Sequence, residues 1–158
     1  KKMEFGCLRY SGNAEGAGVL LKEGVIKIYK NLSKFRGDGS FEGWIRRIFV
    51  NTSIEQYRKK VNLYNVSEAQ ENTIEDKEWN VLDTLAEKDI VKMVQELSPG
   101  YRSVFNMYVI EGYSHKEIGE ILGINEGTSK SQLARAKSVL RKIVESRLNK
   151  TTNDTINF

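Results

Sequence analysis

The sequence is poor in the residues that build covalent or metal-bound scaffolds. Its 158 residues include one Cys, one Pro and one His. A single Cys excludes a disulfide framework and a zinc cluster within one chain, and neither a cofactor nor a metal site is expected. No run approaches the ~20 apolar residues of a membrane span, so we expect a soluble chain without membrane insertion. The scarcity of alternating apolar runs favours an all-α fold.

Signatures of catalysis are also missing from the sequence. The segment GDGS at 37–40 lacks the Lys and the spacing of a phosphate-binding P-loop. His115 falls inside a helix-capping pattern, which predicts a solvent-exposed residue rather than a catalytic base. Cys7 lies in an apolar helical segment with no His near it in the sequence. The chain is therefore predicted to be no enzyme and to take no small-molecule substrate.

Charge is distributed unevenly along the chain. Residues 1–60 hold 13 Lys and Arg against 6 Asp and Glu, whereas residues 61–96 hold 3 against 9. Residues 97–158 return to a positive balance, with 9 basic residues against 6 acidic ones. Two basic blocks around an acidic stretch indicate two surfaces that face a polyanion. The alternative is a set of ordinary solvated helices with uneven charge.

Hydrophobic periodicity divides the chain into two helical parts. Helical spacing of apolar residues continues to about residue 60, fades through the acidic stretch and returns near residue 82. We therefore predict an N-terminal helical domain at 1–61, an acidic flexible linker at 62–84 and a C-terminal domain at 85–148. A disordered tail is expected at 149–158, and each domain is expected to fold independently.

The segment SHKEIGEILGINEGTSKSQLARAKSVL, residues 114–140, has the pattern of two helices around a tight turn. Ser114 and Glu117 form a capping box at the first helix start, and Gly123 permits a left-handed backbone at its end. At about 100° per residue, the second helix gathers its apolar residues on one face: Leu133, Ala136, Leu140, Ile143 and Val144. The other face is small and polar, as a helix entering the DNA major groove requires. The alternative is a plain helical hairpin with a solvated outer face.

Two long segments carry a resemblance to a known family. LSPGYRSVFNMYVIEGYSHKEIGEILGINEGTSKSQLARAKSVLRK, at 97–142, resembles the C-terminal promoter-binding domain of bacterial sigma factors. FRGDGSFEGWIRRIFVNTSIEQYRKK, at 35–60, resembles the N-terminal domain of the extracytoplasmic-function (ECF) group of the sigma-70 superfamily. FGCLRYSGN and EGVIKIYKNL resemble the helices that precede it. The similarity covers roughly 5–60 and 85–145, in the family's order.

The resemblance implies a transcription initiation factor that binds core RNA polymerase and reads the −10 and −35 elements of promoters. A helix-turn-helix regulator, or a sigma-like protein that does not initiate transcription, is the alternative. The implied partners are core RNA polymerase, promoter DNA and an anti-sigma factor, and the implied location is the cytoplasm.

The resemblance also implies the positions of the binding residues. In the C-terminal domain, the residues that match the −35 contacts are Thr128, Lys130, Ser131, Ala134 and Arg135. In the N-terminal domain, the loop 35–41 matches a pocket for a flipped −10 base, and Asn51 matches a residue that hydrogen-bonds there. The full implied −10 set is Phe35, Arg36, Gly37, Asp38, Phe41, Arg47, Asn51, Arg58 and Lys59. Glu23 and Lys27 match polymerase-binding positions, and Arg46 and Lys60 are further candidates for phosphate contacts.

Overall fold

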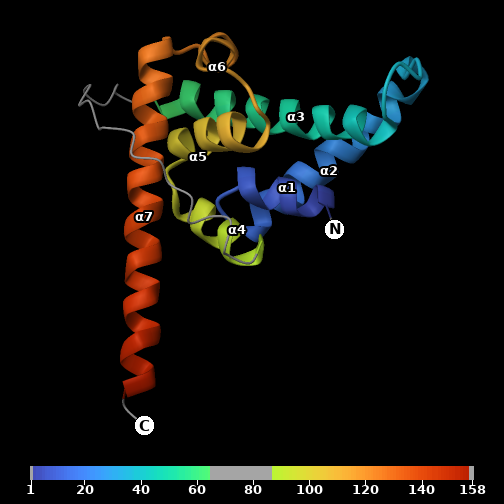
Figure 1. Ribbon diagram of the computed structural model, residues 1–158. Coiled ribbons are helices and arrows are strands. Elements are labelled where there is room, and N and C mark those ends of the chain that lie inside the picture. The colour runs from blue at the N-terminus through green and yellow to red at the C-terminus, as the bar shows by residue number, and fades with distance from the viewer. Residues whose placement is uncertain (1, 65–86, 157–158) are drawn as a thin grey trace.

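The computed structural model describes residues 2–64 and 87–156, which form helices and turns without a strand (Figure 1). The first range contains α1 (Lys2–Tyr10), α2 (Ala14–Asn31), a short 3₁₀ turn η1 (Leu32–Lys34) and α3 (Phe41–Tyr64). The second contains α4 (Glu87–Glu96), α5 (Pro99–Phe105), the π-helical turn η3 (Asn106–Ile110), α6 (His115–Leu122) and α7 (Glu126–Ile156). The all-α prediction is confirmed. Within these ranges, no helix has both the length and the apolarity needed to cross a membrane.

Short polar side chains set where the helices begin. The Asn13 side chain accepts a hydrogen bond from the Gly16 backbone N–H at 2.8 Å, which starts α2. Ser40 caps α3 and Asn125 caps α7 in the same way, at 3.0 and 2.6 Å. These bonds satisfy backbone donors that have no partner inside the helix. At α5, Pro99 occupies the first turn, and Ser98 makes no side-chain capping bond.

Two helices run past their predicted ends. α3 continues to Tyr64, beyond the predicted domain end at residue 61, and the rest of the predicted linker lies outside the described residues. α7 continues to Ile156, into the tail predicted to be disordered. Residues 149–156 contain neither Gly nor Pro, the two residues that disfavour a helix most.

A small core fills the space between α1, α2 and α3. Its buried members are Cys7, Ala17, Leu20 and Phe49. The Phe49 ring lies where a Cβ at Gly24 would stand, so this close crossing of α2 and α3 requires glycine. Burial raises the pKa of the Cys7 thiol to about 11, which leaves it protonated and unreactive at neutral pH.

The larger core joins the two described ranges, here called the N-terminal half (2–64) and the C-terminal half (87–156). Val50 and Ile54 of α3 pack into the same cluster as residues of the C-terminal half. Those residues are Met93, Val94, Leu97, Val104, Phe105, Met107, Ile118, Leu122, Leu133, Ala136, Leu140 and Val144. The two halves thus share a core in this structure, while independent folding of each predicted domain stays a prediction.

Arg102, a buried side chain with 8% of its surface exposed, connects the ends of two helices. Its guanidinium donates hydrogen bonds to the carbonyl oxygens of Val94, Gln95 and Leu97 at 3.2, 3.0 and 2.5 Å. It also donates to the Tyr10 carbonyl at 3.5 Å. These carbonyls belong to the C-terminal ends of α4 and α1, where backbone acceptors lack helical partners and the helix dipole is negative. Burial lowers the pKa of Arg102, although guanidinium stays charged in proteins.

Replacing Arg102 by Met should therefore destabilise the whole fold. Arg102→Met keeps most of the side-chain volume but leaves buried carbonyls at the ends of both helices without donors. We expect a loss of about 3 kcal/mol in the free energy of unfolding, measured by urea denaturation. Arg141→Met on α7 is the matched control, with a change below about 0.5 kcal/mol. Equal effects of the two substitutions would show that Arg102 does not hold the helix ends.

Candidate nucleic-acid interfaces

The helix-turn-helix forms as predicted from its caps and turn. The Glu117 carboxylate accepts hydrogen bonds from the Ser114 backbone N–H and hydroxyl at 2.8 and 2.7 Å, which lowers the pKa of Glu117. Gly123 adopts the left-handed conformation, with φ of 72°. A Cβ at Gly119 would lie 2.7 Å from the Ile124 carbonyl oxygen, so the turn packs directly against α6. These contacts fix the direction in which α7 leaves the turn.

α7 presents a mixed polar face opposite its buried one. Leu133, Ala136, Leu140 and Val144 are buried and Ile143 is partly buried, which confirms the predicted apolar face. Among the predicted −35 residues, Lys130 is exposed and its ammonium pairs with Glu126 at 2.7 Å. The other four are partly exposed: Thr128, Ser131, Ala134 and Arg135. The structure thus brings all five onto the first turns of one helix.

His115 connects α6 to its neighbours and is not the freely solvated residue that the sequence predicted. Its ring stacks on Tyr108, with centroids 4.3 Å apart and planes 17° apart. Its Nδ1 lies 2.9 Å from the hydroxyl of Ser129, a fully buried residue in the first turns of α7. The capping box predicts exposure only for an isolated helix start, and here that start packs between η3 and α7. His115 therefore helps to hold the start of α7 in place.

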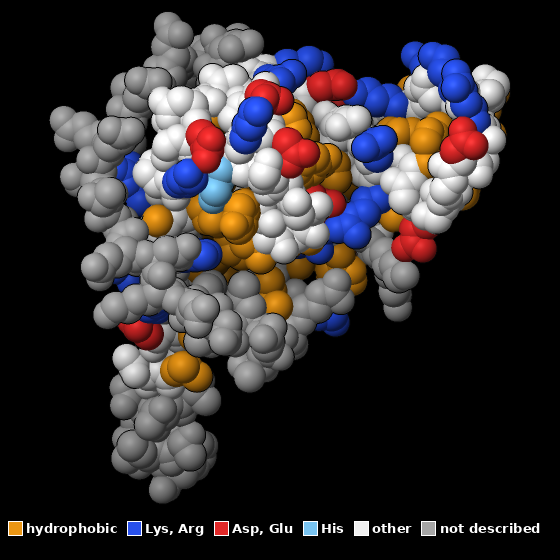
Figure 2. Space-filling view, turned by 45° about the horizontal axis from the view of Figure 1, so that its top comes forward, with side chains coloured by type: hydrophobic (Ala, Val, Ile, Leu, Met, Phe, Trp, Pro, Cys, Tyr) orange, Lys and Arg blue, Asp and Glu red, His pale blue; other side chains and the backbone are white. Residues whose placement is uncertain are grey.

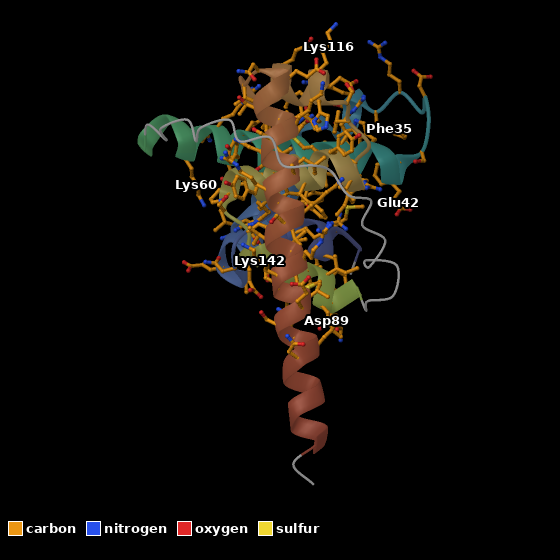
Figure 3. The ribbon with its side chains drawn as sticks, turned by 60° about the vertical axis from the view of Figure 1, so that its left-hand side comes forward. Phe35, Glu42, Lys60, Asp89, Lys116 and Lys142 are labelled. Carbon is orange, nitrogen blue, oxygen red and sulfur yellow. The ribbon has the colours of Figure 1, made fainter. Side chains whose placement is uncertain are left out.

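His115→Ala should loosen this attachment. The substitution removes one hydrogen bond and one ring stack, so we expect a loss of about 1.5 kcal/mol in the free energy of unfolding. Lys116→Ala is the control, because Lys116 is the next residue and its side chain is exposed at the outer end of α6 (Figure 3). Thermal or urea unfolding measures both. A His115→Ala protein as stable as Lys116→Ala would contradict the structural role of His115.

The predicted −10 loop carries a cluster of three aromatic rings. The Phe35 ring lies 5.2 Å from Phe41 and 5.4 Å from Trp44, and Phe41 stacks on Trp44 at 5.8 Å. Phe41 is 45% exposed, so it is not a core residue. Gly37 and Gly39 have positive φ of 78° and 105°, which lets the loop turn sharply beside the rings. Arg36 and Asp38 are exposed in the same loop.

The other predicted −10 residues form a stripe along α3. Arg47, Asn51 and Arg58 recur at spacings of four and seven residues, and Trp44, which was not among the predicted −10 residues, lies three residues before Arg47 on the same side of the helix. Arg47, Asn51 and Arg58 are exposed, as is the neighbouring Lys59. Asn51 follows Trp44 by seven residues, or about 10 Å along the axis. Asn51 and Trp44 thus lie on the same face of α3, about two turns apart along the axis.

Two arginines of α3 contact the C-terminal half. The Arg46 guanidinium donates to the Glu111 carboxylate at 2.9 Å and to the Ile110 carbonyl at 3.3 Å. The Arg58 guanidinium donates to the carbonyl oxygen of Ile121, near the end of α6. Sequence reasoning identified Arg46 as a phosphate-binding candidate but missed Glu111, since 65 residues separate the pair and no local pattern connects them.

The predicted polymerase-binding residues of α2 are engaged with α3. The Lys27 ammonium pairs with Glu55 at 2.6 Å, and Glu23 accepts a hydrogen bond from Gln56 at 3.1 Å. The outer side of α2 and η1 instead exposes large apolar residues: Val19, Val25, Ile26, Tyr29 and Leu32. Sequence reasoning missed this surface, although apolar residues on more than one side of α2 were the available signal.

Comparison with known proteins identifies the family of this chain. The family model described as "Sigma-70 region 2" matches residues 6–62, and the one described as "Sigma-70, region 4" matches residues 87–140. The ECF RNA polymerase sigma factor SigW of Bacillus subtilis is 30% identical over 148 residues, which cover 86% of this chain and 79% of SigW. The chain belongs to the ECF RNA polymerase sigma factors. The predicted resemblance is confirmed in both halves.

Further similar proteins belong to the same family. The ECF sigma factor SigE of Mycolicibacterium smegmatis is 29% identical, over 84% of this chain, and the chain spans 53% of its length. The sigma factor RpoE of Bartonella quintana, solved in complex with the anti-sigma factor NepR, matches with a TM-score of 0.54 at 20% identity. That match covers 91% of this chain and 90% of the other, and it shows a shared fold.

Proposed function

We propose that this ECF sigma factor binds core RNA polymerase and directs it to promoters by reading two DNA elements. The supporting observation is the presence, in one chain and in family order, of an aromatic and basic face on α3 and a capped helix-turn-helix. Its family consists of transcription factors, not enzymes. We place the protein in the cytoplasm, where polymerase and promoter DNA are found.

The first turns of α7 would read the −35 element in the major groove. Arg135 supplies a donor fork for guanine, while Ser131 and Ala134 are small enough to permit close approach. Lys130 is exposed and supplies a charge for a phosphate. The start of α7 favours a phosphate near Thr128 because the positive end of the helix dipole attracts anions, although the Asn125 side chain already accepts the Thr128 N–H.

The face of the N-terminal half would read the −10 element as single-stranded DNA. Phe35, Phe41 and Trp44 offer ring surfaces on which an unpaired base can stack. Asn51 lies on the same face of α3, and its amide would hydrogen-bond the edge of the unpaired base. Arg47, Lys59 and, when released, Arg58 supply charge for the strand's phosphates. The glycines of the loop let Arg36 and Asp38 approach the strand.

The exposed apolar side of α2 would bind core RNA polymerase. Charged Glu23 and Lys27 are positioned by α3 at the edge of this surface. Several large apolar residues exposed on one side of a helix are typical of a protein interface. Because RpoE of Bartonella quintana is seen with the anti-sigma factor NepR, we also propose an anti-sigma factor as a partner of this chain.

Reconstitution with core RNA polymerase tests this function directly. The full chain should co-elute with core polymerase and support promoter-dependent transcription. Tyr29→Asp should abolish both without unfolding the protein, because Tyr29 is 84% exposed. Lys30→Asp, at the next exposed position, is the control and should act more weakly. A chain that binds promoter duplex alone but never polymerase would favour the helix-turn-helix regulator, and one that binds polymerase without transcription would favour the non-initiating sigma-like protein.

Arg135→Ala should weaken binding to −35 duplex DNA and relax specificity at one base pair. Losing one good base contact should reduce the binding free energy by about 1–3 kcal/mol. Lys130→Ala should instead weaken all sequences similarly and reduce the salt dependence. Fluorescence anisotropy on duplexes altered at one position at a time measures both effects. An Arg135→Ala protein that keeps wild-type preferences at every position would remove Arg135 from the readout.

A further inference from the structure

A cavity of about 410 Å³ lies between α1, α3 and the residue that follows η3. Its volume falls within the range of small-molecule sites in proteins, roughly 300–1,000 Å³. None of the residues to which the proposed function assigns a contact with DNA or polymerase lines it. Its wall has an apolar part and a polar part, which include Met3, Phe49 and Val50 on one side and Arg9, Tyr10 and Glu111 on the other.

Two polar atoms in the wall of the cavity are buried and have no hydrogen-bond partner among the residues that the structure describes. They are the Nε of Arg9 and the hydroxyl of Tyr10, both near the C-terminal end of α1. Burial and the nearby Glu111 carboxylate raise the pKa of Tyr10, so the hydroxyl keeps its proton. Buried donors without acceptors are unfavourable. The wall therefore offers one N–H and one O–H donor to the molecule that fills the cavity.

The positive charge of Arg9 is incompletely compensated. Its side chain is 18% exposed, and its ion pair with Glu111 is long, at 3.7 Å. The same carboxylate lies closer to Arg46, at 2.9 Å. That hydrogen bond and the charge of Glu42, which Figure 3 shows at the edge of the molecule, raise the pKa of Arg46. Two guanidiniums thus share Glu111, and an anion beside the more buried Arg9 is favoured.

The apolar part of the wall limits which anion fits. Phe49 and Val50 are buried, and Met3 is partly buried. An inorganic anion would leave these side chains facing water, whereas a hydrocarbon body would cover them. At about 30 Å³ for each water-sized group, the cavity has room for roughly ten to fourteen non-hydrogen atoms. An apolar pocket with a few convergent polar groups is typical of a small-molecule site.

We propose that this cavity binds a small monocarboxylic acid with an apolar body, of the size of a medium-chain fatty acid. The carboxylate accepts hydrogen bonds from the Arg9 Nε and the Tyr10 hydroxyl, and the hydrocarbon lies along Met3, Phe49 and Val50. The ligand is bound and not converted. The inference does not rest on the proposed function, because it uses neither the DNA-binding residues nor the polymerase surface.

The test is titration of the free full-length chain with octanoate, followed by isothermal titration calorimetry and by thermal unfolding. Octanoate should bind at one site per chain and raise the Tm as its concentration rises, because a ligand of the folded state stabilises that state. 1-Octanol and octylamine have the same hydrocarbon chain with a neutral and a cationic headgroup. Both should bind at least about tenfold more weakly, since a charged acceptor makes the stronger hydrogen bonds.

Gly6 provides a variant that fills the cavity. It lines the cavity, and a Cβ added there meets no neighbouring group within 4 Å. Gly6→Leu should abolish octanoate binding and leave the free protein at least as stable, because Leu favours a helix more than Gly does. Gly18→Leu is the matched control, since Gly18 lies in α2 with equally open space at its Cβ but outside this cavity. That variant should bind octanoate as the wild type does.

Tyr10→Phe separates ligand recognition from folding. The hydroxyl has no partner among the described residues, so its removal should leave the Tm of the free protein unchanged or slightly higher. The affinity for octanoate should fall about tenfold, the effect of one hydrogen bond to a charged group. Tyr101→Phe is the control, because Tyr101 packs against the shared core and does not line the cavity. It should retain the wild-type affinity.

Four results would overturn the proposal. Equal binding by the wild type and Gly6→Leu would place octanoate elsewhere, such as on the exposed apolar side of α2. Equal affinities for octanoate and 1-octanol would contradict recognition of a carboxylate, and an unchanged affinity of Tyr10→Phe would remove the Tyr10 hydroxyl from the site. No binding of octanoate at millimolar concentration would show that the cavity holds only ordered water.

Discussion

The buried guanidinium of Arg102 is the interaction on which the arrangement of the two halves depends. A charge taken out of water must be compensated, and here the compensation comes from backbone carbonyls at the ends of α1 and α4. One side chain therefore ends a helix in each half and fixes their relative positions. The shared apolar core around Val50 and Ile54 and the Arg46–Glu111 pair lie on the same interface.

Local chemistry explains which parts of the fold were predictable. The capping box at Ser114, the left-handed Gly123 and the apolar face of α7 are encoded within a few residues, and all were predicted correctly. The roles of Arg102, Glu111 and His115 were not, because each depends on a partner in another helix. Val50 and Ile54 of α3 were likewise not identified, because the residues that they pack against lie in the C-terminal half. The aromatic loop was located by resemblance, and the mutual contacts of its three rings became visible only in the structure.

The closed arrangement has a consequence for promoter recognition. Elements named −10 and −35 lie about 25 base pairs apart, or about 85 Å at 3.4 Å per pair. α7, the longest described helix with 31 residues, spans only about 46 Å. Figure 3 places Phe35 of the aromatic loop and Lys116 of α6 in the upper part of the molecule, and Figure 2, with the top turned forward, shows Lys and Arg side chains across that side. On the proposed function, reading both elements at once would require the halves to separate, and the polar contacts of Arg102, Glu111 and Arg58 would then be exchanged for water.

The distance between the two halves in solution tests this account most directly. Cys7 is buried, so cysteines introduced at the exposed positions Lys34 and Lys116 can carry a fluorescent donor and acceptor selectively. Single-molecule energy transfer should give one narrow, short-distance population for the free protein. Adding core RNA polymerase and promoter DNA should shift this population to a longer distance between the two dyes. A broad distribution in the free protein, already containing the long distances, would contradict the claim that the halves form one closed body.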